Sequence, residues 1–521
     1  MSTNFNPYAN YGYMALIKEA TDTTPVTPTT YVKIISESLL PSFGIQTIAE
    51  IAGSREKNIN SIQGNIEVDG DVALYAEDKI SGHFLRSLLG APTSQTVVAD
   101  TSYRHRFEVQ DDDRTYTFDI NPADAPWVHR FYGVHSGKLL FNKEDNAIKM
   151  TTSLIATRAF LLARVLADVS SGTNLNVDQT GGLTTSDSIL VLSKETGYTT
   201  LEEFTINAIV DENNITVGAA ITATIEADDI VVLKRATVVD SDYTQCEPFQ
   251  FQNGTQILTG DDIDNTTEIS KEDFEIVLEN DLQKIFGSGG DEIDRYPQVI
   301  LVKGYSATGK VSRYYDNEMN LDNLRSNDDI GIRYLFKKHT AISANAAIKA
   351  SSTWGDTVNG FKVEATTGAK AGNDYNITFV INSEDTLAAS ISGKNILVSL
   401  ASTTASKNTG TLVAGVIDAL TGVDGTAEGT GVETFTAAAA NVNLGAKGTG
   451  TDVVGADASE KPYLQIDFSA ANFEPFFPNN EQDAILIEDV PMKFFKDSDC
   501  ADDQRKGWGT KIYLFNDVQS Y

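Results

Sequence analysis

The chain has 521 residues, of which 73 are acidic and 40 are basic, and its formal net charge at pH 7 is −33. A surface this acidic repels nucleic acid and anionic membranes. It argues against an ordinary DNA-binding module, because phosphate contacts need clustered Lys and Arg. Hydrophobic residues make up 41% of the chain, which is enough to build the cores of about two to four domains.

Cysteine content, the N-terminal sequence and the length of apolar runs indicate the cellular compartment in which the chain folds. Only two cysteines occur, Cys246 and Cys500, so no disulfide framework is implied and a reducing assembly compartment is favoured. The first twenty residues show no basic-then-apolar signal pattern. No stretch approaches about eighteen uninterrupted apolar residues, so we expect no membrane span.

The first elements in chain order are short. Residues 1–13 are polar and rich in Tyr, which favours an extended arm over a packed element. The segment Met14–Lys18 follows, then a Thr/Pro turn at Thr23–Thr30 and a strand at Tyr31–Ser36.

The stretch from Ile59 to Gly90 is the most informative part of the sequence. Its first half alternates between two kinds of side chain, which predicts a strand with one apolar and one acidic face. The apolar parity holds Ile62, Ile66, Val68, Val72 and Leu74, and the other parity holds Glu67, Asp69, Asp71 and Tyr75. A short helix is expected next, with Asp78 as its N-cap and Gly90 as a left-handed C-terminal cap. Its apolar stripe is Ile80, Phe84, Leu85 and Leu88.

Two hairpins are predicted after this helix. Arg104–Val109 and Arg114–Ile120 flank the acidic turn Gln110–Asp113. Phe131–Asn142 and Ala147–Ala156 flank Lys143–Asn146. The pattern therefore stays β in this part of the chain.

Two stretches differ in composition from the rest. Residues 163–240 lose aromatics and gain Thr, Val and Asp, which predicts a small all-β insert. Residues 339–460 are rich in Ala, Thr, Gly, Ser and Asn, which predicts a β-rich insert with one helix at Thr411–Leu420. Insertions are tolerated at exposed loops, so both inserts are expected on an outer surface. One host domain would then be written in three parts, at residues 1–162, 241–338 and 461–521.

Further strands are predicted in every part of the chain after residue 162. Gln298–Val302 is a nearly continuous apolar run, which favours a buried strand. The other predicted strands are Leu175–Val177, Ser188–Leu192, Glu203–Ile209, Asn214–Val217, Ile230–Leu233, Phe274–Leu278, Ile330–Phe336, Gly360–Glu364, Tyr375–Ile381, Asn395–Leu400, Tyr463–Phe468, Met492–Phe495 and Thr510–Phe515.

The three host parts resemble the tail tube (major tail) proteins of long-tailed bacteriophages. The residues that carry this resemblance are KEATDTTPVTPTTYVKI from Lys18, Ile59–Gly90, GVHSGKLLFNKEDNAIKMTTSLIA from Gly133, VILVKGYSATGKVSRYY from Val299, and Leu486–Asn516. The resemblance lies in the residue patterns of these segments and in their order along the chain. It implies a mainly β fold, a β-sandwich flanked by a short helix and carrying the two inserts.

The resemblance also implies a function. In that family, sheets from neighbouring subunits close a barrel around a lumen, and the rings, commonly hexameric, stack into the tube through which DNA leaves the capsid. We therefore expect a virion structural protein of the tail, assembled in the host cytoplasm, with no catalysis, no cofactor and no membrane anchor. Its partners would be copies of itself, other tail proteins at the tube ends and viral DNA in transit.

Several finer expectations follow from this resemblance. Two large inserts favour a long, non-contractile siphophage tail, because a contractile sheath would have to enclose them. The inserts would decorate the tube and make weak host-surface contacts. The arm at 1–13, the loop Pro41–Lys57 and Asp517–Tyr521 are candidate contacts between stacked rings. Glu67, Asp69 and Asp71 are proposed to face the lumen as a smooth anionic lining without sticky phosphate contacts.

Sharper motifs are weak by comparison. Gly304–Lys310 matches GxxxxGK, but Val311 replaces the Ser or Thr that binds magnesium, so a turn between two antiparallel strands is favoured. A calcium loop at Asp262, Asp264 and Thr266 lacks the required Gly and Glu. No metal or catalytic site is predicted from His83, His105, His129, His135 and His339. Core or interface positions are expected for Trp127, Trp354 and Trp508.

Two rival functions stay open at this point. One is a β-rich tail fibre or baseplate component that binds host-surface glycans or a receptor, which the inserts fit and the three-part host does not. The other is a nucleotide-using enzyme built on Gly304–Lys310. Hollow tubes or stacked rings in micrographs would favour the tube, and trimeric spikes would favour the fibre.

Overall fold

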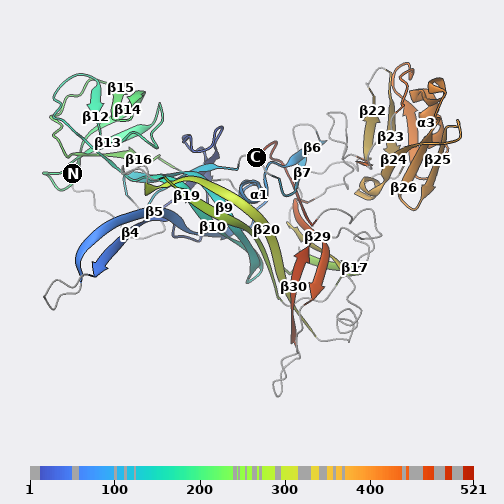
Figure 1. The fold of residues 1–521 in the computed structure, drawn as a ribbon, viewed down its shortest axis with the longest axis horizontal. Helices are drawn as coiled ribbons and strands as arrows, with labels where there is room; N and C mark the ends of the chain where they lie inside the picture. The colour runs from blue at the N-terminus through green and yellow to red at the C-terminus, as the bar shows by residue number, and fades with distance from the viewer. Residues whose placement is uncertain are drawn as a thin grey trace.

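The structure is a computed structural model, and it is mainly β (Figure 1). It describes residues 12–49, 58–98, 102–110, 114–122, 125–238, 243, 247–252, 255–260, 267–268, 273–287, 295–314, 330–338, 349–355, 359–366, 370–436, 442–444, 461–473, 487–495 and 509–521.

The central sheet takes its strands from three stretches of the sequence. Before residue 163 the elements are β1 (Met14–Lys18), β2 (Thr30–Val32), β3 (Ser36–Glu37), β4 (Leu40–Ala49), β5 (Asn58–Tyr75), α1 (Ser81–Leu89), β6 (Thr93–Val98), β7 (Ser102–Phe107), β8 (Tyr116–Ile120), β9 (Trp127–Glu144) and β10 (Ala147–Phe160). The second stretch supplies β17 (Thr255–Gly260), β18 (Thr267–Glu268), β19 (Asp273–Phe286), β20 (Pro297–Tyr314) and β21 (Ile330–Lys337). The third supplies β29 (Tyr463–Phe473), β30 (Ile487–Phe495) and β31 (Thr510–Asn516).

The strand pairing joins these three stretches. Hydrogen-bonded neighbours run in the order β4–β5–β10–β9–β19–β20–β30–β29–β21–β17, all antiparallel. A branch of β8, β1 and β2 leaves β9, and a branch of β31, β7 and β6 leaves β29. One buried cluster also spans the three stretches, and within it the rings of Tyr334 and Phe468 meet edge to face at 6.1 Å.

The alternation predicted for β5 is confirmed. Ile66, Val68 and Val72 are buried, whereas Glu67 and Asp69 lie on the other face with higher exposure. The hairpin of β9 and β10 is confirmed as well, with Glu144 paired to Ala147 around a two-residue turn. Asp145 in this turn has φ of 53°, a conformation that tight hairpin turns require and that Asp tolerates.

The hairpin predicted around Gln110–Asp113 is wrong. β7 is paired on its two edges with β6 and β31, and β8 is paired with β1 and β9. Each strand therefore has two other neighbours. The partner β31 lies some four hundred residues away in sequence, so the local pattern could not indicate it.

The helix α1 confirms its predicted apolar stripe but not its predicted N-cap. Phe84, Leu85 and Leu88 are buried. The N-cap residue is Ile80, with no side-chain capping bond, and the carboxylate of Asp78 instead binds the Lys338 ammonium at 2.5 Å. Both partners are buried, so tertiary pairing has displaced the cap. The helix ends at Leu89, and its C-cap residue is Gly90, whose φ of 109° favours glycine although its ψ of −174° is not left-handed helical.

The 163–240 region forms its own strands, as predicted. They are β11 (Ala163–Arg164), β12 (Asn174–Asn176), β13 (Ser188–Ser193), β14 (Thr199–Asp211), β15 (Asn214–Val217) and β16 (Ile230–Lys234). Their hydrophobic cluster is separate from that of the central sheet, but it also takes in Tyr13, Val128 and Phe160. Leu233 of β16 pairs with Val128 of β9, so the two sheets are joined.

The 339–460 region has a third hydrophobic cluster of its own. Its elements are β22 (Ser351–Trp354), β23 (Phe361–Ala365), η3 (Lys370–Asp374), β24 (Asn376–Ile381), β25 (Ala388–Ser392), β26 (Asn395–Leu400), η4 (Ala405–Asn408), α3 (Gly410–Asp418), β27 (Val423–Ala427) and β28 (Val442–Asn443). The predicted helix is confirmed, and the Thr409 side chain caps it by accepting a bond from the Leu412 amide. Figure 1 shows the two regions on opposite sides of the central sheet.

Candidate functional site

The acidic face of β5 is bound by a lysine that the sequence analysis missed. The Lys284 ammonium on β19 lies 2.5 Å from Glu67 Oε2 and 3.1 Å from Asp69 Oδ2. The lysine side chain is 14% exposed, while the two acids are 46% and 47% exposed. Lys284 falls on the same parity of β19 as the buried Phe274 and Ile276, and a cation at an apolar position was the available signal.

Asp71 has different surroundings. Its Oδ1 atom accepts a hydrogen bond of 2.6 Å from the Ser153 hydroxyl, and its amide donates to Ser38 Oγ at 2.9 Å. Among the described residues it forms no salt bridge. Of the three proposed acids, Asp71 is therefore the one whose charge is not bound to Lys284.

The strand register places charges of both signs on this sheet face. Residues directly opposite one another present their side chains on the same face. Asp71 pairs with Ser153, Ser153 with Lys138, and Lys138 with Glu279. The face that carries the acids of β5 therefore also carries Lys138, with Glu279 on one side of it and Ser153, followed by Asp71, on the other.

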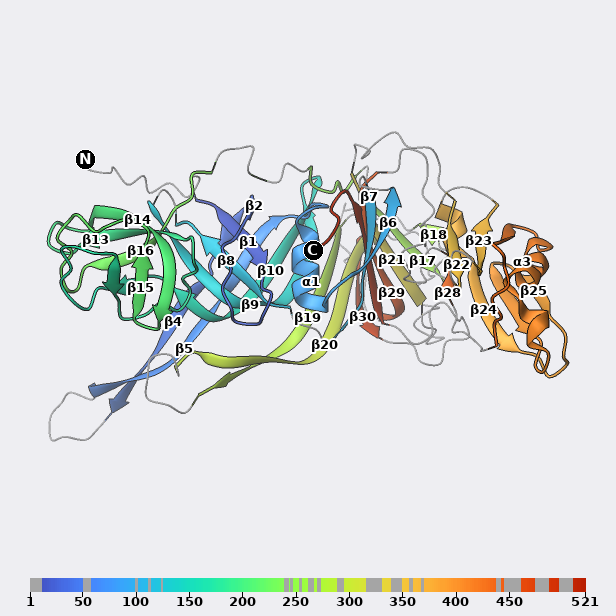
Figure 2. The same cartoon turned by 90° about the horizontal axis from the view of Figure 1, so that it is seen from above.

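Two long strand pairs project from the central sheet. We call residues 40–49 with 58–69 the β4–β5 arm, and residues 280–286 with 297–304 the β19–β20 arm. Figure 2 shows both arms extending beyond the body on the same side. Besides the Lys284 contacts, the Arg295 side chain donates from Nε to the Gly64 carbonyl at 2.9 Å. The two arms are therefore in contact.

Both arms expose apolar side chains. Ile285, Val299 and Leu301 on the β19–β20 arm are 41%, 44% and 44% exposed. Leu40 and Ile45 on the β4–β5 arm are 58% and 64% exposed. The expectation that Gln298–Val302 is buried is therefore wrong for Val299, Leu301 and Val302, although Ile300 between them is buried. The strand is apolar, but it extends past the body of the chain, where nothing in the described chain covers its outer face.

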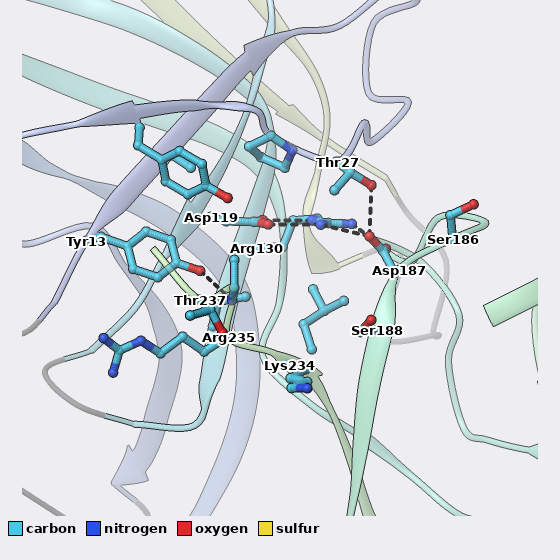
Figure 3. Close-up of a pocket in the computed structure, with 16 residues that line it drawn as sticks. Tyr13, Thr27, Asp119, Arg130, Ser186, Asp187, Ser188, Lys234, Arg235 and Thr237 are labelled. Atoms are coloured by element: carbon cyan, nitrogen blue, oxygen red, sulfur yellow. Dashed lines mark hydrogen bonds and ion pairs between the residues drawn. The ribbon is translucent and has the colours of Figure 1, made fainter. Parts of the chain in front are cut away.

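A second polar site lies where the central sheet meets the 163–240 region (Figure 3). The guanidinium of Arg130 on β9 binds Asp119 Oδ1 at 2.7 Å and Asp187 Oδ2 at 2.6 Å, and it is 1% exposed. Burial lowers the pKa of Arg130, but the two carboxylates outweigh this and raise it above its usual value. The arginine stays charged and holds the two sheets together.

A cavity of about 310 Å³ opens beside this arginine. Tyr13, Tyr31 and Leu233 contribute apolar walls, and Ser186 and Lys234 contribute polar ones. Ser186 has φ of 75°, a rare conformation for a residue with a side chain. Every wall comes from the junction of the two sheets.

The GxxxxGK motif is part of a strand. Gly304–Lys310 lies within β20, which runs from Pro297 to Tyr314, and so it forms neither a phosphate loop nor the turn favoured from the sequence. Phe494 explains the second glycine, because a Cβ at Gly309 would lie 2.8 Å from its ring. A Cβ at Gly304 would meet no atom of the described residues within 4 Å.

Other predicted positions fall in three groups. Asp262, Asp264, Thr266, His339 and Trp508, with residues 1–11 and 50–57, lie outside the described residues. Trp354 is buried in the cluster of the 339–460 region, and Trp127 is partly buried. In the part of the chain that the structure describes, no three His, Cys, Asp or Glu residues are grouped to hold a metal ion.

The side chain of Tyr521 is not free to contact a subunit in a neighbouring ring of the expected tube. Its side chain is buried against α1, and its hydroxyl donates to the Asp78 carbonyl at 2.8 Å. The aromatic ring of Tyr521 also meets the imidazole of His83 edge to face, with 5.1 Å between the ring centroids. Of the predicted stacking segment, only the residues before Tyr521 keep exposed surface, and among these Asp517 binds Lys79.

No helix among the described residues is long and apolar enough to cross a membrane. The sequence matches no curated protein. It does match the family described as phage tail tube protein, over residues 10–359, which is more than half of the chain. This match spans the central sheet up to β21, including both arms, and also the 163–240 region. The chain therefore belongs to the phage tail tube protein family.

Proposed function

We propose that copies of this chain close into rings, six to a ring as is common in the family, and that stacked rings form the hollow tube through which viral DNA leaves. The observation that carries the proposal is the family match over residues 10–359. A tail tube protein is a structural component of the virion tail. Assembly in the host cytoplasm fits a chain with only two cysteines.

The proposed host domain comprises residues 1–162, 241–338 and 461–521, with residues 163–240 and 339–460 as inserts. In support, strands of the three host parts share one ladder, and the 339–460 region has its own hydrophobic cluster. The cluster of the 163–240 region is separate from that of the central sheet, although it takes in a few host residues. Both inserts would lie on the outside of the tube and make weak host-surface contacts. Such decoration favours a non-contractile tail, because no sheath then has to enclose it.

In the proposed tube, Glu67, Asp69 and Asp71 face the lumen. The three carboxylates outnumber the ammonium groups of Lys284 and Lys138, which leaves this part of the face negative. Lys284 is held by two acids, so a passing phosphate would have to compete with both of them for it. DNA in transit would then displace few counterions at Lys284, and counterion release is what strong phosphate binding requires.

Electron microscopy of the concentrated, purified chain tests the tube. Hollow tubes or stacked rings are the expected result. Trimeric spikes would favour a fibre or baseplate role, and a protein that stays monomeric at all concentrations would overturn the proposal.

A test of the lumen assignment needs a variant that keeps the salt bridges of Lys284 intact. Reversing Glu67 and Asp69 would also free Lys284, whereas Asp71→Lys changes only an acid that forms no salt bridge among the described residues. We expect Asp71→Lys to form tubes but to slow DNA ejection. Glu195→Lys, the same reversal at an exposed residue of the 163–240 region, is the control. Equal ejection rates for the two variants would contradict a lumenal Asp71.

A further inference from the structure

The two arms carry stretches without charge in a strongly charged protein. Charged residues make up 22% of the chain, yet Leu40–Ala49 and Pro297–Val302 contain none. Two copies with a net charge of −33 each repel one another over most of their surfaces. Electrostatic repulsion between two copies is weakest where neither copy presents charged side chains. The arms offer such surfaces.

The exposed apolar residues of the β19–β20 arm form one cluster. Ile285 is directly opposite Val299 in the ladder, so the two side chains are neighbours on one face. Leu301 is two residues further along β20 and therefore on the same face. The three side chains form an apolar patch on the outer face of the arm.

Strand edges lie beside these apolar residues. In the described part of the chain, the ladder pairs residues 299–304 of β20 with β19 only, and it pairs β4 with β5 only. Natural edge strands are usually protected by charges, prolines or a covering segment, because an unprotected edge recruits another strand. Residues 42–45 and 299–302 carry neither charge nor proline.

We propose that the outer face and edge of the β19–β20 arm, at Ile285, Val299 and Leu301, are a docking surface for the β4–β5 arm of a second copy of this chain. A tail tube protein assembles with itself, and each copy brings both an apolar β4 edge and an apolar β20 edge. Contact between two different surfaces is head-to-tail, so it can close a ring or continue a stack. The inference rests on the proposed self-assembly.

Lys284 positions the docking arm. Its ammonium group binds Glu67 and Asp69 on β5, and Arg295 binds the Gly64 carbonyl, so the β19–β20 arm is held against β5 of its own chain. Lys284 lies on the parity opposite to Ile285. It therefore binds β5, which is not paired with β19 in the ladder, while the apolar patch lies on the other parity of β19. The acids of β5 serve the arm in this way whether or not they also line a lumen.

The docking surface is tested by Val299→Asp in the full chain, with Val210→Asp as the matched control. Val210 is also an exposed strand valine, but it lies on β14 in the 163–240 region. Burying a valine at an interface is worth enough that Val299→Asp should raise the concentration needed for assembly about tenfold or more. Val210→Asp should assemble as the wild type does, and both variants should keep the wild-type melting temperature.

The outcomes separate the two proposals. A wild-type chain that never assembles overturns the proposed function and this inference together. A wild type that assembles, with a Val299→Asp variant that assembles equally well, overturns this inference alone. Equal losses in the two variants would also overturn it, because the effect would then come from added charge and not from position.

The role of Lys284 has its own test. Lys284→Met removes the ammonium group, whereas Lys284→Arg keeps a cation that can bind both carboxylates. We expect the Met variant to assemble poorly, the Arg variant to restore assembly, and both to melt within a few degrees of the wild type. Assembly of the Met variant at wild-type concentration would show that Lys284 does not position the arm.

Discussion

Nη1 of Arg130 on β9 donates a hydrogen bond of 2.6 Å to Oδ2 of Asp187, which precedes β13 in the 163–240 region. The same guanidinium binds Asp119 on β8 through Nε at 2.7 Å. The Thr27 hydroxyl also donates to Asp187, at 2.8 Å. Segments that are far apart in the sequence therefore meet at one buried arginine.

We predict that Arg130→Met destabilises the fold severely. The change leaves two carboxylates buried without their cation, which typically costs about 3–5 kcal/mol in the free energy of unfolding. Denaturant unfolding measures this. The control is Lys194→Met, which breaks an exposed pair with Asp228 and should cost less than about 1 kcal/mol. A loss below about 1 kcal/mol for Arg130→Met would contradict the structure at this junction.

The two glycines of GxxxxGK should respond differently to alanine. Gly309→Ala places a methyl group against the Phe494 ring, which itself stacks on Phe468, so we expect a loss of about 1–3 kcal/mol in the free energy of unfolding. Gly304→Ala has open space and should be nearly neutral. A phosphate loop would instead make both changes affect nucleotide binding, which titration of ATP would detect.

Acid should destabilise the fold through His83. Burial, with a further contribution from Arg86, lowers the pKa of His83 from 6.5 to about 4. The folded state therefore disfavours the imidazolium, so stability is complete above about pH 6.5 and is lost as the pH falls towards 4. Melting temperatures measured across this window should fall less in His83→Phe, which keeps a ring against Tyr116 and Tyr521. Identical pH profiles for the two proteins would refute this role.

Glu19 should act with the opposite sign. Burial raises the pKa of Glu19, although hydrogen bonds from the Gly133 amide and Thr117 hydroxyl act against it. Its stabilising contribution is complete below the unfolded pKa and is lost as the pH rises through the folded pKa. Glu19→Gln keeps an acceptor oxygen without the charge. It should raise the melting temperature at pH 7 and leave it unchanged near pH 4, and a lower value at pH 7 would contradict this.

Local patterns predicted strands and helices well where one face of an element is buried. Val68, Val72 and Leu74 alternate with acids because β5 has one packed face, and that pattern needs only neighbouring residues. The helix stripe of Phe84, Leu85 and Leu88 was readable for the same reason. Asp78 looked like a helix cap because its partner Lys338 is two hundred and sixty residues away.

The errors share a physical cause. Val299 and Leu301 are apolar, and an apolar run usually means burial, but no local signal tells whether a strand ends inside the body or projects from it. The hairpin predicted for β7 and β8 failed because β31 and β9 are better placed to pair with them. Competition between strands for partners is settled by the whole fold.

The sequence by itself determined the mainly β character, most strand positions and the family resemblance, because hydrophobic period and turn residues act over a few neighbours. Only the tertiary structure decided that Lys284 grips Glu67 and Asp69, that Arg130 joins two sheets, and that the arms expose apolar edges. Those contacts join residues between 11 and 217 positions apart in sequence, and they depend on how strands pair across that separation.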